Sequence, residues 1–337
     1  MKRDLRIVFM GTPEFAVGVL STLVEAGKNI VGVITAPDRP SGRGRKLTGS
    51  AVKEYAVSQD IPVLQPTNLK NEDFLTELKA LNANLHIVVA FRMLPKVVWA
   101  MPEYGTFNLH ASLLPQYRGA APINWAIINK ESKTGVTTFF IDEKIDTGEI
   151  ILKDEVQINR DETVGTLHDT LMEVGSNLVV KTVKAIAKGD VTTIPQPKNV
   201  SGETLDLKEA PKLTPENTYI DWNASMETID AFVRGLNPYP GAWSYLIQGE
   251  DKQKVKIFNV AEILNTEEIF SDINISEEKV TGDVFVKGKR LFVKLTKEVL
   301  EILEIQLPGK RRMKTKDLLN GYSFDVSCKM FANPHSH

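Results

Sequence analysis

The sequence predicts an α/β fold: a Rossmann-like N-terminal domain with a mainly parallel sheet, followed by a smaller C-terminal β-barrel domain of the OB-like kind. The chain opens on a strand–helix–strand pattern over residues 5–35. Short β-type runs separated by turn signals fill residues 243–307, which is typical of a barrel. A chain of 337 residues also exceeds the usual size of a single core. We therefore expect one domain over residues 1–188, a linker over 189–208 and the barrel domain over 209–330.

The opening strand–helix–strand pattern has clear punctuation. Residues 5–10 form an apolar strand, and Thr12 and Pro13 suit the N-cap and first position of a helix that stops at Gly27. A nicotinamide-dependent dehydrogenase would fit this opening. However, the first turn holds one glycine where dinucleotide sites use G-x-G-x-x-G, and this counts against that function.

Hydrophobic periodicity places the remaining elements. Helices are expected at residues 50–59, 71–81, 123–129, 163–187, 225–234 and 317–320. Strands are expected at residues 29–35, 61–64, 85–90, 105–110, 135–141, 149–158, 243–247, 255–263, 282–286, 290–295 and 299–307. Residues 189–202 are poor in helix formers and contain proline, which favours a linker.

The composition indicates an ordinary soluble protein, with 42% hydrophobic and 25% charged residues. No apolar run is long enough to span a bilayer, and the N-terminus lacks the apolar core of a signal peptide. Cys328 is the only cysteine, which excludes a disulfide framework and a cysteine-based metal site. We expect a cytoplasmic monomer with no metal and no membrane partner. The net charge of −2 neither indicates nor excludes a nucleic-acid partner.

Two basic stretches interrupt this balanced composition. Residues 36–50 form a loop with four basic side chains, at Arg39, Arg43, Arg45 and Lys46, against a single acid. A second cluster, over residues 310–316, begins with Lys310 and Arg311. Either could be an ordinary solvated surface. The length of the first loop and its place after a strand favour contact with a polyanion.

The polar residues of highest interest lie in the stretch 105–122. On a strand over residues 105–110, Asn108 and His110 share one face, while Phe107 and Leu109 point the other way. Pro115 then ends the regular strand. A polar pair at a strand end is typical of a ligand site in an open α/β sheet. An imidazole beside an amide donor can serve as an acid or base and as an oxyanion donor.

Asp146 is the third candidate, in an Asp-Thr-Gly turn after a strand that can neighbour the first. Its carboxylate could orient the His110 imidazole, or act through a water molecule. Taken singly, Asp146 is more often a turn former and His110 more often a hydrogen-bonded structural histidine, so the hypothesis rests on all three residues falling at the ends of apolar strands. The sequence contains no credible metal-ligand set. His86 is expected to be a core or edge residue.

Three motifs resemble the signature of the folate-dependent formyltransferase family: Asn108-x-His110-x-Ser-Leu-Leu-Pro115, Tyr117-Arg-Gly-Ala-x-Pro122 and Asp146-Thr-Gly148. The resemblance implies an N-terminal formyltransferase domain that transfers the formyl group of 10-formyltetrahydrofolate to an amine. It implies that the catalytic residues are Asn108, His110 and Asp146, which polarise the formyl carbonyl, stabilise the tetrahedral intermediate and manage protons.

The same resemblance implies a folate site. Its expected residues are Ser112, Leu113, Leu114, Pro115, Phe91, Arg92, Met93 and Leu94. The second segment departs from the family pattern, because it reads Ala-Phe-Arg-Met-Leu-Pro where Ala-Tyr-Gly and one further residue precede Leu-Pro. We expect contacts there through the backbone and a pocket of altered shape.

Further motifs resemble the family members that act on initiator methionyl-tRNA. These motifs are the opening Gly11-Thr-Pro-Glu-Phe-Ala16, the Pro37-Asp-Arg-Pro-x-Gly-Arg-Gly44 loop, Ile220-Asp-Trp222 and Asn237-Pro-Tyr-Pro240. The resemblance implies formylation of the free α-amino group of that tRNA's methionine for translation initiation. The residues expected to bind tRNA are Arg39, Arg43, Arg45, Lys46, Lys310 and Arg311.

Other functions stay open at this point. A formyltransferase acting on glycinamide ribonucleotide or an amino sugar would share the catalytic residues, but it would not explain the basic loop or the barrel. A hydrolase that releases formate from the same folate is a further alternative. An inert RNA-binding module would leave the convergence of Asn108, His110 and Asp146 without a reason.

Overall fold

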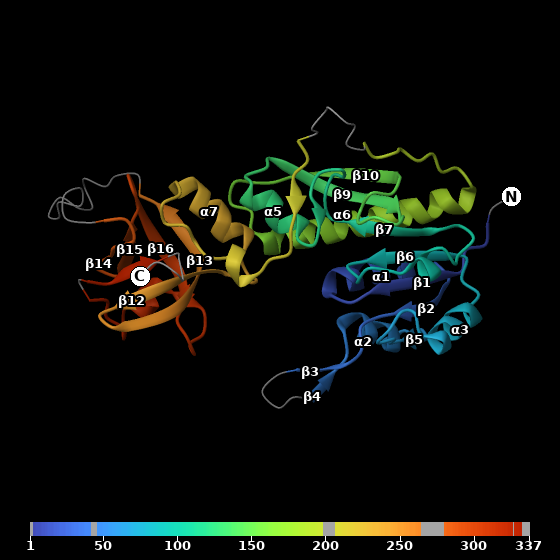
Figure 1. The fold of residues 1–337 in the computed structure, drawn as a ribbon, viewed down its shortest axis with the longest axis horizontal. Coiled ribbons are helices and arrows are strands. Elements are labelled where there is room, and N and C mark those ends of the chain that lie inside the picture. Colours follow the sequence, from blue (N-terminus) through green and yellow to red (C-terminus); the bar gives the residue numbers. More distant parts are fainter. Residues whose placement is uncertain (1–2, 42–45, 198–205, 264–279, 326, 332–337) are drawn as a thin grey trace. The chain divides into compact units, whose positions relative to one another are not determined.

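The computed structural model describes residues 3–41, 46–197, 206–263, 280–325 and 327–331 (Figure 1). The chain forms two compact units. The first comprises Met1–Pro122, Lys133–Gln157 and His168–Ala210, and the second comprises Ile123–Ser132, Ile158–Leu167 and Pro211–His337. Among the described residues, no helix is both long and apolar enough to cross a membrane. The domain boundaries expected from the sequence stay a prediction.

The first unit is built on a seven-stranded sheet with the order β10-β9-β7-β6-β1-β2-β5 (Figure 1). Its strands are β1 (Ile7–Gly11), β2 (Ile30–Ile34), β5 (Val63–Leu64), β6 (Leu85–Val89), β7 (Thr106–His110), β9 (Lys133–Phe140) and β10 (Ile150–Gln157). The pairs from β7 to β5 are parallel, and only β9 and β10 run antiparallel to their neighbours. Every residue of β1 and of β6 is buried, as expected for parallel strands covered on both faces. The predicted mainly parallel sheet is confirmed.

Helices cover both faces of this sheet. They are α1 (Glu14–Glu25), α2 (Ala51–Ser58), α3 (Glu72–Ala80), α4 (Lys96–Trp99) and α6 (Val164–Lys188). Helix α5 (Pro122–Ile128) belongs to the second unit from Ile123 onward. Helices α3 and α4 pack on Val8, Met10 and Val88 through one apolar cluster. Helix α6 lies on the other face, where a methyl group at Gly175 would come within 2.8 Å of Leu109. The odd residues of β7 therefore face α6, and Asn108 and His110 face the opposite side.

His86 lies in β6 and is 1% exposed. Burial lowers the pKa of this imidazole to about 4, and its Nδ1 has no hydrogen-bond partner. The side chain is therefore a neutral core residue at physiological pH, as its position in an apolar run predicts.

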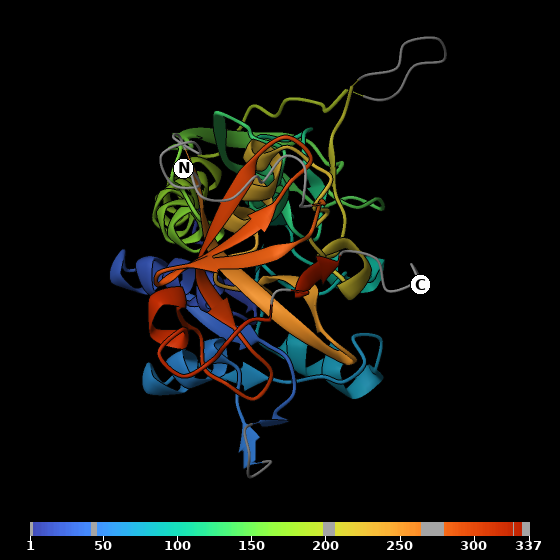
Figure 2. The ribbon, with the colours of Figure 1, turned by 90° about the vertical axis from the view of Figure 1, so that its left-hand side faces the viewer.

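The second unit contains an antiparallel barrel. Its strands are β12 (Ala242–Gln248), β13 (Asp251–Glu262), β14 (Val284–Lys287), β15 (Arg290–Lys294), β16 (Val299–Gln306), β17 (Met313–Lys314) and β18 (Lys329–Phe331). The strand order is β14-β15-β16-β13-β12-β18, with β17 paired to β16. The two ends of this order meet, because the Val284 N–H donates to the Cys328 carbonyl at 2.9 Å and the Met330 N–H to the Gly282 carbonyl at 2.7 Å. Figure 2 shows these strands in orange to red, twisted around one another. The predicted barrel is confirmed.

The barrel core is apolar and includes one helix face. Ile257, Ile302 and Val293 are fully or almost fully buried inside the barrel. The helix α7 (Met226–Gly235) packs Ile229 and Val233 into the same cluster. The unit also holds the short helices η1 (Pro215–Asn217) and α10 (Thr315–Leu318).

Three helix starts follow the expected capping chemistry. Ser50, Asn71 and Ser225 cap α2, α3 and α7, each accepting a backbone N–H from three residues further on. The prediction for α1 is wrong in detail. The helix begins at Glu14, its N-cap position is taken by Pro13 in an extended conformation, and no side chain caps it. Pro13 has no side-chain acceptor, and Thr12 lies one position before the N-cap, so neither residue caps the helix.

The basic loop at residues 36–50 has regular structure on both sides of its tip. Residues Arg39–Ser41 (β3) pair antiparallel with Lys46–Thr48 (β4). The local composition, rich in glycine and proline, predicts only a loop. The pairing shows that the segment is a short hairpin that carries Arg39 on one strand.

Candidate active site

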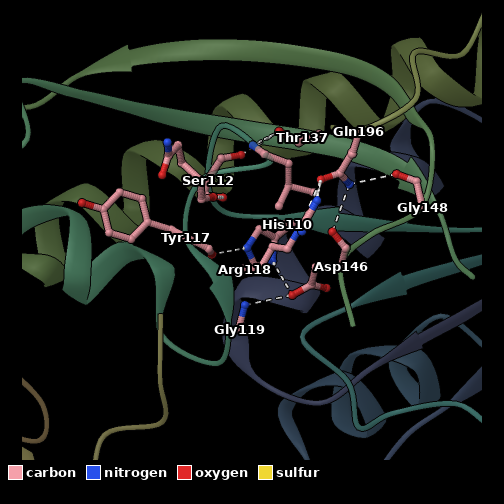
Figure 3. Close-up of polar contacts among 11 residues, drawn as sticks. His110, Ser112, Tyr117, Arg118, Gly119, Thr137, Asp146, Gly148 and Gln196 are labelled. Atoms are coloured by element: carbon pink, nitrogen blue, oxygen red, sulfur yellow. Dashed lines mark hydrogen bonds and ion pairs between the residues drawn. The ribbon is translucent and has the colours of Figure 1, made fainter. Parts of the chain in front are cut away.

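His110 and Asp146 come together in the first unit, although 35 residues of chain separate their positions. His110 is the last residue of β7, and its Nδ1 lies 3.8 Å from Asp146 Oδ2 (Figure 3). Because β9 runs antiparallel to β7, the turn after β9 begins beside Thr106, whose carbonyl accepts the Ile141 N–H at 2.8 Å. The turn must therefore run back along β7 to bring Asp146 to His110.

The hydrogen bonds of His110 determine where its proton lies. Its Nε2 is 2.8 Å from the carbonyl oxygen of Tyr117. A carbonyl only accepts, so Nε2 carries the hydrogen and donates it. In the neutral ring, Nδ1 then has a free lone pair and faces the Asp146 carboxylate. His110 is 6% exposed, and Nδ1 is the nitrogen that can take up a proton beside a counter-charge.

The Asp146 carboxylate is oriented by the loop that follows β7. Its Oδ2 accepts the backbone N–H of Gly119 at 3.0 Å. Gly119 lies in β8 (Arg118–Gly119), which pairs in parallel with β11 (Glu209–Ala210). A side chain at Gly119 would meet the Ala210 carbonyl oxygen at 2.5 Å, and its φ of 125° is one that glycine tolerates. The close approach of these backbones therefore places the donor for Asp146.

Asn108 supplies an unoccupied amide group on the same strand face. It is half-buried, two residues before His110, and its backbone pairs with Val88 on one side and Phe139 on the other. Within the described part of the chain, its carboxamide has no hydrogen-bond partner. It can therefore donate to an oxygen of a bound molecule.

A second amide was missed by the sequence reasoning. Gln196 donates to the carbonyl oxygens of Asp146 and Gly148 and accepts from Arg118 (Figure 3). It comes from the stretch that the sequence assigns to a linker. No local pattern marks it, because a glutamine after a proline-containing segment is ordinary in a linker.

The segment expected to bind folate is held from within the protein. Ser112 and Leu114 are fully buried, whereas Leu113 and Pro115 are partly exposed. The Thr137 hydroxyl donates to the Ser112 carbonyl at 2.6 Å and accepts the Leu114 N–H at 3.2 Å. Ser112 and Leu114 are thereby held in the interior, and Leu113 and Pro115 keep partial exposure. Whether these residues contact folate stays a prediction.

The second expected folate segment, residues 91–94, follows β6. Because Val89 pairs with Leu109, this segment leaves the sheet beside the end of β7. Met93 is 70% exposed, whereas Leu94 is buried in the apolar core. Phe91 is half-buried, and Arg92 donates to the carbonyls of Pro66 and Thr67. Arg92, which departs from the family pattern, thus connects this loop to the one that contains Pro66 and Thr67.

The basic residues expected to bind tRNA lie in both units. Arg39 is exposed on β3, Lys46 opens β4, and Lys310 and Arg311 are exposed beyond β16. Arg43 and Arg45 lie outside the described residues. Burial, and secondly the charge of Arg39, lower the pKa of the Arg92 guanidinium. The roles of these residues stay predictions.

The arrangement is suited to acyl-type transfer. It offers an unoccupied amide donor, an imidazole with a free nitrogen and a carboxylate beside that nitrogen, all without a metal ligand set among the described residues. Such groups can stabilise charge on a carbonyl oxygen and hold a proton during attack by a nucleophile.

Comparison with known proteins agrees with this chemistry. Residues 5–183 match the model of the formyl transferase family, and residues 212–323 match that of the formyl transferase C-terminal domain. A protein named methionyl-tRNA formyltransferase from Flavobacterium johnsoniae is 52% identical over 97% of this chain and 99% of its own length. A protein of the same name from Bacteroides fragilis is 49% identical over 98% of this chain and 99% of its own.

Solved structures share the fold at lower identity. HypX from Aquifex aeolicus, in complex with tetrahydrofolic acid, superimposes with a TM-score of 0.61 at 16% identity, over 96% of this chain and 49% of its own. The sugar 3N-formyl transferase WlaRD also gives a TM-score of 0.61, at 17% identity, over 92% of this chain and 100% of its own. On the family match and the identity along nearly the whole length of its relatives, the chain belongs to the formyl transferase family.

Proposed function

We propose that this protein transfers the formyl group of 10-formyltetrahydrofolate to the free α-amino group of initiator methionyl-tRNA. The observation that carries the choice of substrate is the 52% identity, over 97% of the chain, to a relative named methionyl-tRNA formyltransferase. The site geometry supports the chemistry, because Asn108, His110 and Asp146 offer the donor, base and counter-charge that a formyl transfer needs. The cytoplasmic location and the monomeric state stay predictions.

The proposed reaction begins with attack by the neutral α-amine on the formyl carbon. A carbon–nitrogen bond forms, and negative charge develops on the formyl oxygen, where an N–H of Asn108 can stabilise it. The bond from the formyl carbon to the folate nitrogen then breaks. The amine loses one proton and the folate nitrogen gains one.

The His110–Asp146 pair can hold the proton between these two events. His110 takes it on Nδ1, because Nε2 already donates to Tyr117, and the Asp146 carboxylate 3.8 Å away stabilises the imidazolium. The proton passes from the amine to the His110–Asp146 pair directly or through a water molecule.

A substrate panel tests the proposed function. Purified protein is incubated with 10-formyltetrahydrofolate and, in separate reactions, methionyl-tRNA, glycinamide ribonucleotide, a nucleotide-linked amino sugar or no amine. We expect formylmethionyl-tRNA as the product and only slow formate release without an amine. Faster transfer to one of the small amines, or rapid hydrolysis without an amine, would replace this proposal by the corresponding alternative.

We further propose that the basic residues of β3 and of the 310–316 cluster bind phosphates of the tRNA. Replacing Arg39 by Ala is expected to raise the KM for methionyl-tRNA by about 3- to 10-fold. The slope of the logarithm of the binding constant against the logarithm of salt concentration should fall by about one, as expected for the loss of one phosphate contact. The same change at Arg43 should act in the same direction. The KM for the folate should not change in either variant. Kinetics at two salt concentrations measure both quantities.

The matched control is Lys133→Ala, since Lys133 is paired with Glu155 at 2.7 Å and lies outside both basic stretches. Its tRNA kinetics should match those of the wild type. Unaltered tRNA kinetics in the Arg39 and Arg43 variants would show that the hairpin is an ordinary surface element.

A further inference from the structure

Gln196 joins three parts of the first unit through one buried side chain. Gln196 is 5% exposed. Its Nε2 donates to the carbonyl oxygens of Asp146 at 2.9 Å and Gly148 at 2.8 Å, and its Oε1 accepts from Arg118 at 2.6 Å. Arginine only donates and carbonyls only accept, so the orientation of the amide is unambiguous. The N–H groups of the Gln196 carboxamide therefore bind the Asp146 turn, and its oxygen binds Arg118.

The turn that Gln196 contacts has an unfavourable backbone conformation. Asp146 has a φ of 54°, a value that residues other than glycine rarely adopt. A side chain at Gly148 would approach the Phe140 carbonyl oxygen to 1.6 Å, so the turn is also tightly packed. A backbone conformation of this kind persists only when surrounding contacts maintain it. The two carbonyls bound by Gln196 belong to these same two residues.

The segment that carries Gln196 is itself anchored. Ile194 exchanges two backbone hydrogen bonds of 2.9 Å with Ile150, the first residue of β10. Thr193 donates to the Glu149 carboxylate. The glutamine therefore reaches the turn from a base that is attached to the sheet immediately after that turn.

We propose that Gln196 is a positioning residue that holds the Asp146–Gly148 turn so that the Asp146 carboxylate faces His110. This role rests on the proposed function. Gln196 contacts backbone carbonyls and Arg118, and it acts on the reaction through Asp146. Loss of its two N–H donors lets the turn relax, and the carboxylate then moves away from His110 Nδ1.

Two variants separate the parts of this contact. Gln196→Met keeps the length of the side chain and removes both the donors and the acceptor. Gln196→Glu keeps oxygen acceptors for Arg118, removes the donors and places a negative charge against the two carbonyls. We expect both variants to lower kcat by about 10- to 100-fold, with the KM for each substrate within about twofold of the wild-type value.

Asn84→Ala is the matched control for a purely structural amide. Asn84 is 6% exposed, donates to the Asp4 carbonyl at 2.8 Å and accepts the Arg6 N–H at 2.7 Å, just before β6 and at the far end of the strands from His110. Its loss should lower the melting temperature and leave kcat unchanged. An equal loss of kcat in Asn84→Ala, or wild-type kcat in both Gln196 variants, would overturn the proposal.

A spectroscopic readout keeps the inference separate from the proposed function. The ¹⁵N signals of the His110 ring are recorded in the wild type and in all three variants. They should move in the Gln196 variants and stay in place in Asn84→Ala. If the wild type does not formylate methionyl-tRNA, the proposed function fails. In that case, a shift of the His110 ring signals in the Gln196 variants still supports the positioning role, and unchanged signals overturn it.

Discussion

Replacing His110 by Ala is expected to lower kcat for formyl transfer by about 10²- to 10⁴-fold, the usual contribution of a general acid or base. The physical reason lies in the two ring nitrogens. Nε2 donates to the Tyr117 carbonyl, so Nδ1 alone can hold the proton lost by the amine, 3.8 Å from Asp146 Oδ2. Alanine removes that proton acceptor. Single-turnover rates with 10-formyltetrahydrofolate and methionyl-tRNA measure the loss at the chemical step.

His168→Ala is a suitable control for this prediction. His168 also has a carboxylate beside its Nδ1, that of Asp169 at 2.9 Å, but it lies on α6 and is partly exposed. This variant should keep the wild-type rate. Thermal unfolding and folate binding should show that His110→Ala remains folded. A rate within about threefold of the wild type in His110→Ala would show that His110 is structural.

Replacing Asp146 by Asn should lower kcat by about 10²- to 10³-fold, because the variant removes the charge beside the imidazole while leaving the turn in place. An asparagine oxygen can still accept the Gly119 N–H that Asp146 binds at 3.0 Å. Asparagine also tolerates the positive φ of 54° at this position. The expected loss is therefore electrostatic, and it should appear in kcat with little change in either KM.

Asp142→Asn is the control within the same turn. Asp142 accepts from the Lys144 N–H at 3.0 Å and from the Thr147 hydroxyl at 2.8 Å, and it is paired to neither His110 nor Gly119. Its variant should retain transfer at close to the wild-type rate. Wild-type kcat in Asp146→Asn would mean that the negative charge has no part in catalysis, and the mechanism above would then be wrong.

The strands were predictable from the sequence because their signal is local. The run that forms β1 is apolar throughout and that of β6 is apolar except for His86, and the structure buries both strands on both faces. The alternation along β7 is equally local. It places Asn108 and His110 on one face, and the structure places Leu109 against α6 on the other. The barrel followed from short strands with turn signals.

The details that escaped prediction depend on neighbours in space. The segment rich in glycine and proline contains the paired strands β3 and β4. Composition did not predict this pairing, because it depends on backbone hydrogen bonds between the two strands. The N-cap of α1 moves by one residue because Pro13 is extended. Ser112 and Leu114 are buried because Thr137 and the apolar cluster with Phe139 and Ile150 hold their segment.

The amino-acid sequence determines the α/β sheet, the barrel and the candidate residues on β7, because hydrophobic periodicity acts over a few neighbouring residues. Only the tertiary structure decides how the site is arranged. The Gly119 N–H reaches Asp146 across 27 positions of sequence, and Gln196 reaches the same residue across 50. Contacts over such separations arise when strands pair and turns fold back. The proton position on His110 and the orientation of Asp146 are therefore properties of the folded chain.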